Sequence, residues 1–247
     1  MKALGTIRCL FALVISGFLL TSCLEEGGCF TGFGERRTEV REFPHFDRVF
    51  LEGRLDVTYY RDSAFRVEVS YGHKLMESIS TKLEGNTLRI SNEVACKGLR
   101  DPGKVARIAI YAPEIAYLNN KLAGDLSFHD TLRTGSFTYE QWQSNGEIRL
   151  ILNTDTAKVF AHVGYTHITV AGRTDVAEIY SVSSGPLEAL NLRSRLLWAN
   201  NSSTRDMTVY ASEYLFAFVG RNGGIRYAGD PDVVETDIVG SGSVRPY

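Results

Sequence analysis

The chain has 247 residues, of which 27 are basic and 29 acidic, so its formal net charge is −2. Nucleic-acid surfaces are strongly basic, and this charge balance argues against nucleic acid as a partner. The length allows one large β domain or two small ones. Past residue 22, no apolar run reaches the roughly 18 residues that mark a membrane-spanning helix.

Residues 1–22 have the features of a lipoprotein signal peptide. Lys2 and Arg8 supply positive charge, and the apolar run at residues 9–20 is too short to span a membrane. The run ends in the letters LTSC, which resemble the bacterial lipobox. In proteins with that signal, the cysteine thiol receives diacylglycerol and the chain is cut before it. We therefore expect Cys23 to be lipidated, so that the mature protein is anchored to a membrane without spanning it.

Residues 23–44 are polar and rich in glycine, and they predict a lipidated tether ahead of the domain. Cys29 lies in this tether, and Cys96 is the other cysteine left outside the signal peptide and the lipidation site. An oxidising export compartment favours a Cys29–Cys96 disulfide. Two separate thiols agree equally well with the sequence, because it does not give the distance between the two Cα atoms.

Alternating apolar and polar residues predict strands from about residue 46 onwards. The segments RLDVTYY, FRVEVSY and VARIAIYAP place apolar side chains at every second position. Gly85 and Asn86 predict a turn before a further strand. One short helical turn is expected at GHKLMESI, where three apolar residues share a face. The first part of the domain is thus expected to be an irregular β region.

The second half of the chain contains a repeat of short strands separated by small turn residues. These turn residues follow one another at intervals of 18 to 22 positions: Gly124, Gly146, Gly164, Gly185, Ser203, Gly223 and Gly242. A period near 20 predicts stacked rungs that share one core. We expect an all-β fold in which residues from about 115 to 247 form a short right-handed parallel β-helix-like solenoid, within a single domain at residues 45–247. A β-sandwich or jelly roll is the alternative. The expected inward residues of successive rungs are Ile168, Ile179, Leu197, Leu215 and Ile225.

Several motifs occur in the order seen in one known family. Gly53, Asp56 and Val57 are followed by VEV at residues 67–69, then by a GNTLRI hairpin, and the chain closes with YAGDPDVVETDIVGSGSV. This order resembles the auto-transporter adhesin head GIN domain of Bacteroidetes-type bacteria. The resemblance implies a β-helical envelope lipoprotein, and it implies no catalytic residues.

The sequence contains no nucleophile elbow, P-loop or HExxH motif, each of which would indicate a catalytic or nucleotide-binding site. His162 and His167 supply at most half of a zinc site. The acids of the second half do not recur at one rung position in the sequence, as the groove of a glycan-cleaving β-helix would require: Asp155, Asp175, Glu178, Glu188, Asp206 and Glu213. We therefore expect no enzyme, no cofactor and no metal. A glycan-processing enzyme and a purely structural envelope protein remain the alternatives.

Aromatic residues fall in successive rungs, at Tyr139, Trp142, Trp198, Tyr214, Phe216 and Tyr227. Most such residues fill the core, but an exposed row would contact sugar rings or side chains of a partner. Trp198 with Asn200 and Asn201 is the expected ligand-binding set, because tryptophan beside amides suits a glycan. The expected function is a surface module for binding or adhesion, with a glycan or an extracellular protein as partner.

The residues after the lipidation site suggest where the protein is exported. Leu24 occupies the position where many inner-membrane lipoproteins carry Asp. Glu25 and Glu26 resemble the acidic pair that directs Bacteroidetes lipoproteins to the cell surface. We expect an outer-membrane lipoprotein that faces outward. The alternative is one that faces the periplasm.

Overall fold

The structure is a computed structural model that describes residue 29, residues 31–96 and residues 101–247. Cys23, the predicted lipidation site, and the predicted signal peptide lie outside the described residues. The described chain is almost entirely β, which confirms the predicted class. Its elements are β1 Arg36–Glu42, β2 Arg48–Gly53, β3 Leu55–Arg61, β4 Arg66–Gly72, the 3-10 helix η1 His73–Ser78, β5 Ile79–Glu84, β6 Thr87–Asn92, β7 Ala106–Ala112, β8 Tyr117–Leu122, β9 Leu126–Phe128, β10 Leu132–Ser181, β11 Leu187–Asn201, β12 Met207–Val219, β13 Ile225–Ala228, β14 Val233–Ile238 and β15 Val244–Pro246.

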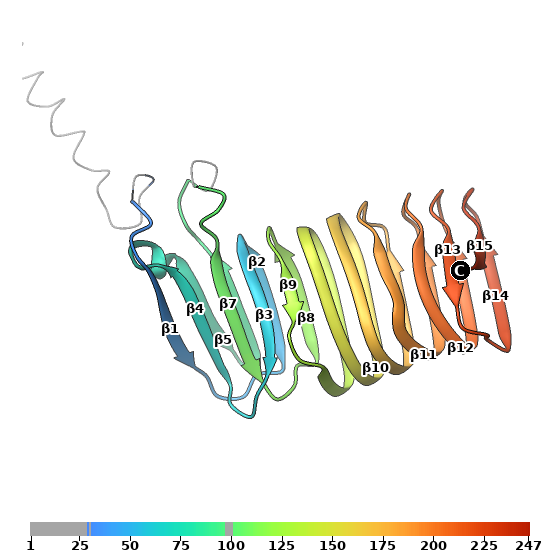
Figure 1. Cartoon of the computed structure of the whole chain (residues 1–247), viewed down its shortest axis with the longest axis horizontal. Helices are drawn as coiled ribbons and strands as arrows, with labels where there is room; N and C mark the ends of the chain where they lie inside the picture. Colours follow the sequence, from blue (N-terminus) through green and yellow to red (C-terminus); the bar gives the residue numbers. More distant parts are fainter. Residues whose placement is uncertain (1–28, 30, 97–100) are drawn as a thin grey trace, which may run out of the picture.

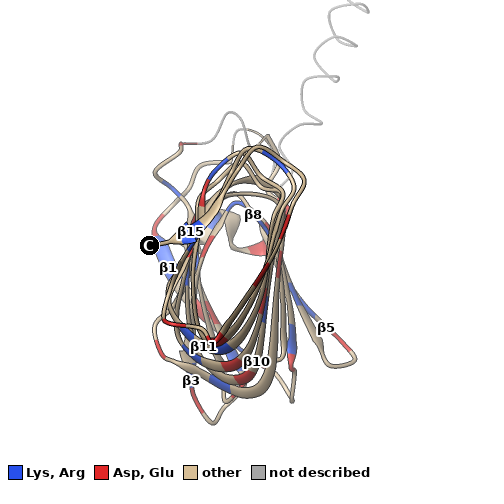
Figure 2. Ribbon diagram, turned by 90° about the vertical axis from the view of Figure 1, so that its right-hand side faces the viewer, with Lys and Arg blue, Asp and Glu red and all other residues tan. Residues whose placement is uncertain are grey.

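All fifteen strands belong to one curled sheet, and they lie side by side along the long axis of the molecule (Figure 1). The first wall runs in the order β1-β4-β7-β3-β9 and continues through β10, β11 and β12 to β13 and β15. The second wall contains β5, β6, β2 and β8, then further parts of β10 to β12, and ends at β14. Viewed along the long axis, the ribbons trace a flattened loop, so the two walls face each other (Figure 2).

Parallel pairing between successive turns of the chain builds the second half. Ile168 in β10 pairs with Leu187 in β11, and Ser181 pairs with Asn201, so partners lie 19 or 20 residues apart. This is the interval predicted from the turn residues. Within the described chain, antiparallel pairs occur only between β1 and β4, β4 and β7, and β5 and β6. A jelly roll or sandwich would need antiparallel pairing throughout.

The N-terminal region is more ordered than the sequence analysis expected. Residues 36–42 were assigned to the tether, but they form β1, which pairs along its whole length with β4. The segment escaped recognition because it lies at an edge: only two of its seven residues are even partly buried, so no alternation of apolar residues marks it. The predicted helical turn is confirmed as η1, with Leu75 and Met76 buried.

Cys29 and Cys96 form a disulfide in the structure, with Cα atoms 5.2 Å apart. Nearby, the ring of Phe33 packs edge-on against Tyr71 at a centroid distance of 5.3 Å. The segment before β1 is therefore attached to the domain by a covalent bond and by an aromatic contact.

The core lies between the two walls. All five residues predicted to face inward are at most 2% exposed: Ile168, Ile179, Leu197, Leu215 and Ile225. Pairing aligns Ile168 with Leu187, Leu187 with Met207, and Met207 with Ile225, which gives a column of apolar side chains across four strands. Each turn of the chain thus buries its apolar residues against its neighbours.

Two of the predicted turn glycines are required by the close approach of backbone segments. Gly146 has a φ of 111°, and a Cβ atom there would lie 2.5 Å from the carbonyl oxygen of Gly124. A Cβ atom at Gly242 would lie 2.6 Å from the carbonyl oxygen of Gly223. A side chain at either position would collide with backbone of the preceding turn, which explains why glycine recurs at this interval.

Candidate functional site

A row of aromatic rings covers the outer side of the second wall where β10, β11 and β12 lie next to each other. Side chains alternate between the core and solvent along each strand, so residues paired across strands share one side. Trp198 pairs with Glu178 and with Phe216. We call the resulting surface the aromatic face, and it consists of Trp142, Phe160, His162, Tyr180, Trp198, Tyr214 and Phe216.

Ring contacts join the aromatic face into two groups, one of Trp142, Phe160, His162 and Tyr180 and one of Trp198 and Tyr214. The ring of Trp142 stacks on His162 with centroids 3.8 Å apart and planes at 16°. His162 lies 5.6 Å from Tyr180, and Trp198 lies 5.5 Å from Tyr214. Contacts at these distances stabilise ring pairs beyond the area they bury. The rings within each group therefore hold one another in place on the sheet.

A shallow groove of about 340 Å³ runs over the aromatic face, and Trp198, Asn200 and Tyr180 are among its lining residues. Trp142 is 38% exposed and Trp198 is 41% exposed. Large exposed rings gathered in one place are typical of surfaces that contact a partner. Two of the three predicted ligand-binding residues, Trp198 and Asn200, thus lie together on this surface.

The third predicted residue, Asn201, lies inside the molecule and is excluded from the site. It is 0% exposed, and its amide nitrogen donates to the carbonyl oxygens of Arg205 and Gly224 at 2.8 Å each. Its side-chain oxygen accepts hydrogen bonds from Ser203. The physical reason is alternation: neighbouring residues of a strand point to opposite sides, so Asn200 and Asn201 cannot both reach a ligand. Asn201 satisfies backbone groups at the end of β11 instead.

His162 is the histidine of the aromatic face. Partial burial lowers the pKa of its imidazole, because the charged form loses solvation, and the nearby carboxylate of Glu140 acts in the opposite direction. The ring is therefore held mainly neutral near pH 7, which suits stacking on Trp142.

The two remaining candidates from the aromatic series have other roles. Tyr139 is fully buried, burial raises the pKa of its phenol, and its hydroxyl accepts a hydrogen bond from Asn120 at 2.9 Å. Tyr227 packs against the core and is partly buried. Both fill space, as most aromatic residues of the series were expected to do.

The histidines considered for a metal have different neighbours. His162 stacks on Trp142, whereas Nε2 of His167 lies 3.3 Å from a carboxylate oxygen of Glu188. Within Cys29, residues 31–96 and residues 101–247, no group of three or more His, Cys, Asp or Glu residues is placed to hold a metal ion. In the same part of the chain, no helix is long and apolar enough to cross a membrane.

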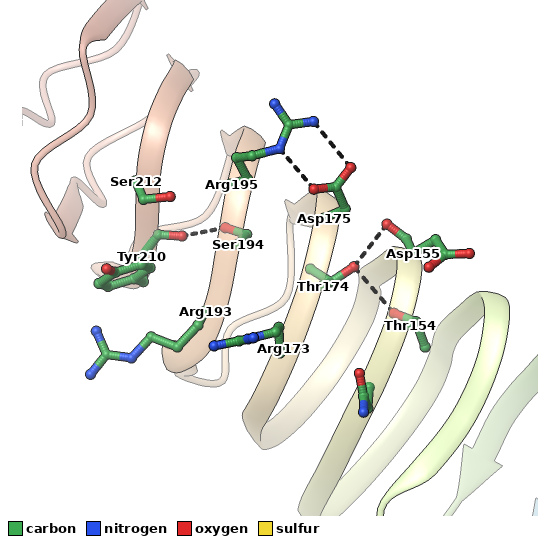
Figure 3. Close-up of a pocket in the computed structure, with 11 residues that line it drawn as sticks. Thr154, Asp155, Arg173, Thr174, Asp175, Arg193, Ser194, Arg195, Tyr210 and Ser212 are labelled. Carbon is green, nitrogen blue, oxygen red and sulfur yellow. Dashed lines mark hydrogen bonds and ion pairs between the residues drawn. The ribbon is translucent and has the colours of Figure 1, made fainter.

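A second, polar groove of about 740 Å³ lies where β10, β11 and β12 turn from the first wall to the second (Figure 3). Sequence reasoning missed it, because the acids were judged not to recur. Asp155 and Asp175 both line it, and Arg195 bridges Asp175 and Glu213 with bonds of 2.7 and 2.8 Å. Asp155, Asp175 and Arg195 come together because they follow one another at intervals of 20 residues, the spacing of parallel partners.

Fold and surface together place the chain among all-β proteins built from short, repeated, largely parallel strands. Residues 45–231 match the family described as "Putative auto-transporter adhesin, head GIN domain". The chain belongs to this family, as the order of its sequence motifs predicted. No curated protein matches the chain.

Solved structures from Bacteroides and Parabacteroides species share the fold. A "putative adhesin" from Bacteroides fragilis NCTC 9343 has a TM-score of 0.75 at 21% identity, covering 86% of this chain and 97% of the other. A "Putative lipid binding protein" from Parabacteroides distasonis ATCC 8503 has a TM-score of 0.67 at 23% identity, covering 87% and 97%. A "putative adhesin" from the same organism has a TM-score of 0.64 at 20% identity, covering 87% and 98%. At these identities the similarity establishes the fold alone.

Proposed function

We propose that this protein is a lipid-anchored, non-enzymatic binding module of the cell surface, and that the aromatic face is its contact with a glycan. The observation that carries the proposal is the gathering of packed rings on β10 to β12, with Trp142 and Trp198 exposed among them. Trp198 offers a flat apolar surface to a sugar ring, and Asn200 beside it offers an amide for hydroxyl groups. The family description, with its reference to an adhesin, supports a binding role.

A glycan array with the full chain, purified in detergent, tests this proposal. Trp198→Ala should weaken binding of any retained glycan about tenfold or more, since losing one stacked ring removes more than 1.4 kcal/mol of contact energy. Asn200→Ala should weaken it less. Tyr165→Ala removes a more exposed ring outside the aromatic face, 62% exposed, and should leave binding unchanged. Equal binding by the wild type and Trp198→Ala would refute the role of the aromatic face.

The alternative of a glycan-processing enzyme would place its chemistry in the polar groove, where acids gather. Hydrogen bonds from Arg195 lower the pKa of Asp175, so its carboxyl group stays ionised. A glycosidase needs one carboxyl group that is protonated near neutral pH as its general acid. Asp175 does not meet that requirement, so it is not suited to be the general acid.

Lipidation at Cys23 and location at the cell surface are further parts of the proposal. The signal peptide and the LTSC motif support lipidation at Cys23, and Cys23→Ser should abolish incorporation of labelled palmitate and leave unprocessed precursor. Protease added to intact cells should remove the wild-type protein, whereas Glu25→Ala/Glu26→Ala cells should retain it. Resistance of the wild type in intact cells, with cleavage after lysis, would instead support the periplasm-facing alternative.

We also propose that residues from about 115 onwards form a short right-handed parallel β-helix. Parallel partners at intervals near 20 residues support it, and connections between parallel strands are almost always right-handed. The handedness of the connections in a crystal structure tests this assignment.

A further inference from the structure

The polar groove lies where the sequence interval between paired residues of neighbouring strands changes. Arg173 in β10 pairs with Arg193 in β11, which is twenty residues further along the chain. In the next turn the interval falls, and Ser194 pairs with Ala211, seventeen residues further along. The turn in β12 is therefore shorter than the turns in β10 and β11. The groove forms at this change of interval and is lined by residues from all three strands.

Arg173 and Arg193 are adjacent like charges without a carboxylate partner. Both side chains are exposed, and Figure 3 shows them on the same side of the groove. In the part of the chain that the structure describes, the side chain of Arg173 makes no ion pair or hydrogen bond. The guanidinium of Arg193 lies over the ring of Tyr210, 4.2 Å from its centroid, and has no carboxylate within ion-pair distance among the same residues. Like charges at paired positions of a sheet repel each other, and no carboxylate close to this pair offsets the repulsion.

The nearby acids do not supply that counter-charge. Asp175 holds Arg195 through two bonds of 2.7 and 3.0 Å, and Glu213 binds the same guanidinium at 2.8 Å. Asp155 also lines the groove, but Figure 3 shows its carboxylate on the side of Asp175, away from the guanidinium groups of Arg173 and Arg193. The groove is thus divided into a side with an ion-paired cluster and a side with two unpaired arginines.

We propose that Arg173 and Arg193 form a binding site for an oxyanion, a phosphate or sulfate group carried by a larger ligand. Neighbouring strands are about 4.8 Å apart, so two guanidinium groups on paired residues can converge on one such group. Each presents planar, forked donors that match its oxygen atoms. The guanidinium of Arg193 packs on the ring of Tyr210, and Ser212 lines the same groove. This site is separate from the aromatic face and goes beyond the function proposed above.

Binding of defined anions by the full chain in detergent tests the site. The probes are dextran sulfate, uncharged dextran of the same length, and glycerol phosphate as a lipid-headgroup fragment. Dextran sulfate, glycerol phosphate or both should bind, dextran sulfate should bind more tightly than uncharged dextran, and binding of the anionic probes should weaken as salt screens the charges. Arg173→Gln and Arg193→Gln should each weaken binding about tenfold, as expected for losing one charge-assisted contact. Which anionic probe binds tells a polymer-borne group from a headgroup.

Controls separate a binding role from a structural one. Arg149→Gln removes an equally exposed arginine that is already paired with Glu147, and it should leave anion binding unchanged. The Arg173→Gln/Arg193→Gln double variant should melt at or above the wild-type temperature, because the repulsion is relieved, and dextran sulfate should no longer raise that temperature. Unchanged binding by the double variant, or no binding of any anion by the wild type, overturns the proposal. Trp198→Ala should still bind glycerol phosphate, so this site can fail or succeed independently of the aromatic face.

Discussion

Leu197→Ala is the sharpest test of the arrangement of the core. Leu197 is 0% exposed and lies between Ala177 and Leu215 on the neighbouring strands. The change removes three carbon atoms from the interior, which at ~0.8 kcal/mol per buried CH₂ amounts to about 2.4 kcal/mol. Ala177 and Ala199 are too short to fill the space, so a cavity penalty adds to this loss. We expect a total of about 3–4 kcal/mol, within the range of ~2–5 kcal/mol measured for such substitutions.

Urea unfolding followed by circular dichroism measures this difference in the free energy of unfolding. The comparison requires equal slopes of free energy against urea for the two proteins, since a stack of repeats can unfold in stages. Val163→Ala is the matched control, because Val163 is 56% exposed and its loss should change stability by less than ~0.5 kcal/mol. If Leu197→Ala is equally mild, the inward direction assigned to this residue is wrong.

Two further predictions concern covalent and electrostatic details. A non-reduced digest should yield a peptide pair linked through Cys29 and Cys96, a bond that stabilises the fold by ~4 kcal/mol in the chain-entropy model, and two free thiols would contradict it. His162 should titrate below its ordinary pKa of 6.5 by NMR, because the fold favours the neutral ring. Stability should therefore fall as the pH drops below about 6.5. Glu140→Gln should lower the pKa further, and a midpoint at or above 6.5 would contradict the burial of the ring.

Features with local periodicity could be predicted from the sequence. Alternation of apolar residues correctly assigned the inward direction of Ile168 and Ile225, and the small turn residues revealed the interval of parallel pairing. These features are predictable because each depends on one strand or one turn at a time. β1 lacked any such pattern, since an exposed edge strand that buries little is held mainly by backbone pairing.

The surface sites could be predicted only in part, because they depend on alignment between strands. Trp198 and Asn200 were identified together, but strict alternation places Asn201 inside. The pairing of Arg173 with Arg193 could not be found without the register, since a drift of one or two residues per turn changes every lateral neighbour. The interval between paired residues varies between 17 and 20 across this groove. Because of that variation, the sequence alone did not predict the site.

One strand carries both proposed contacts, and this yields a last prediction. Arg193 and Trp198 are five residues apart on β11, and both are exposed because the alternation of buried and exposed residues shifts by one at Arg195 and Leu196. Five residues span about 17 Å at ~3.3 Å per residue, and less if the strand bends between them. A sulfated oligosaccharide of several rings can reach both, so binding at one site raises the effective concentration at the other. For such a ligand, the losses from Arg193→Gln and Trp198→Ala should not add, because either change removes the simultaneous contact. Glycerol phosphate is too short to span the two sites, so its binding should respond to Arg193→Gln but not to Trp198→Ala. Additive losses with the long ligand would mean that the aromatic face and the arginine pair bind separate molecules.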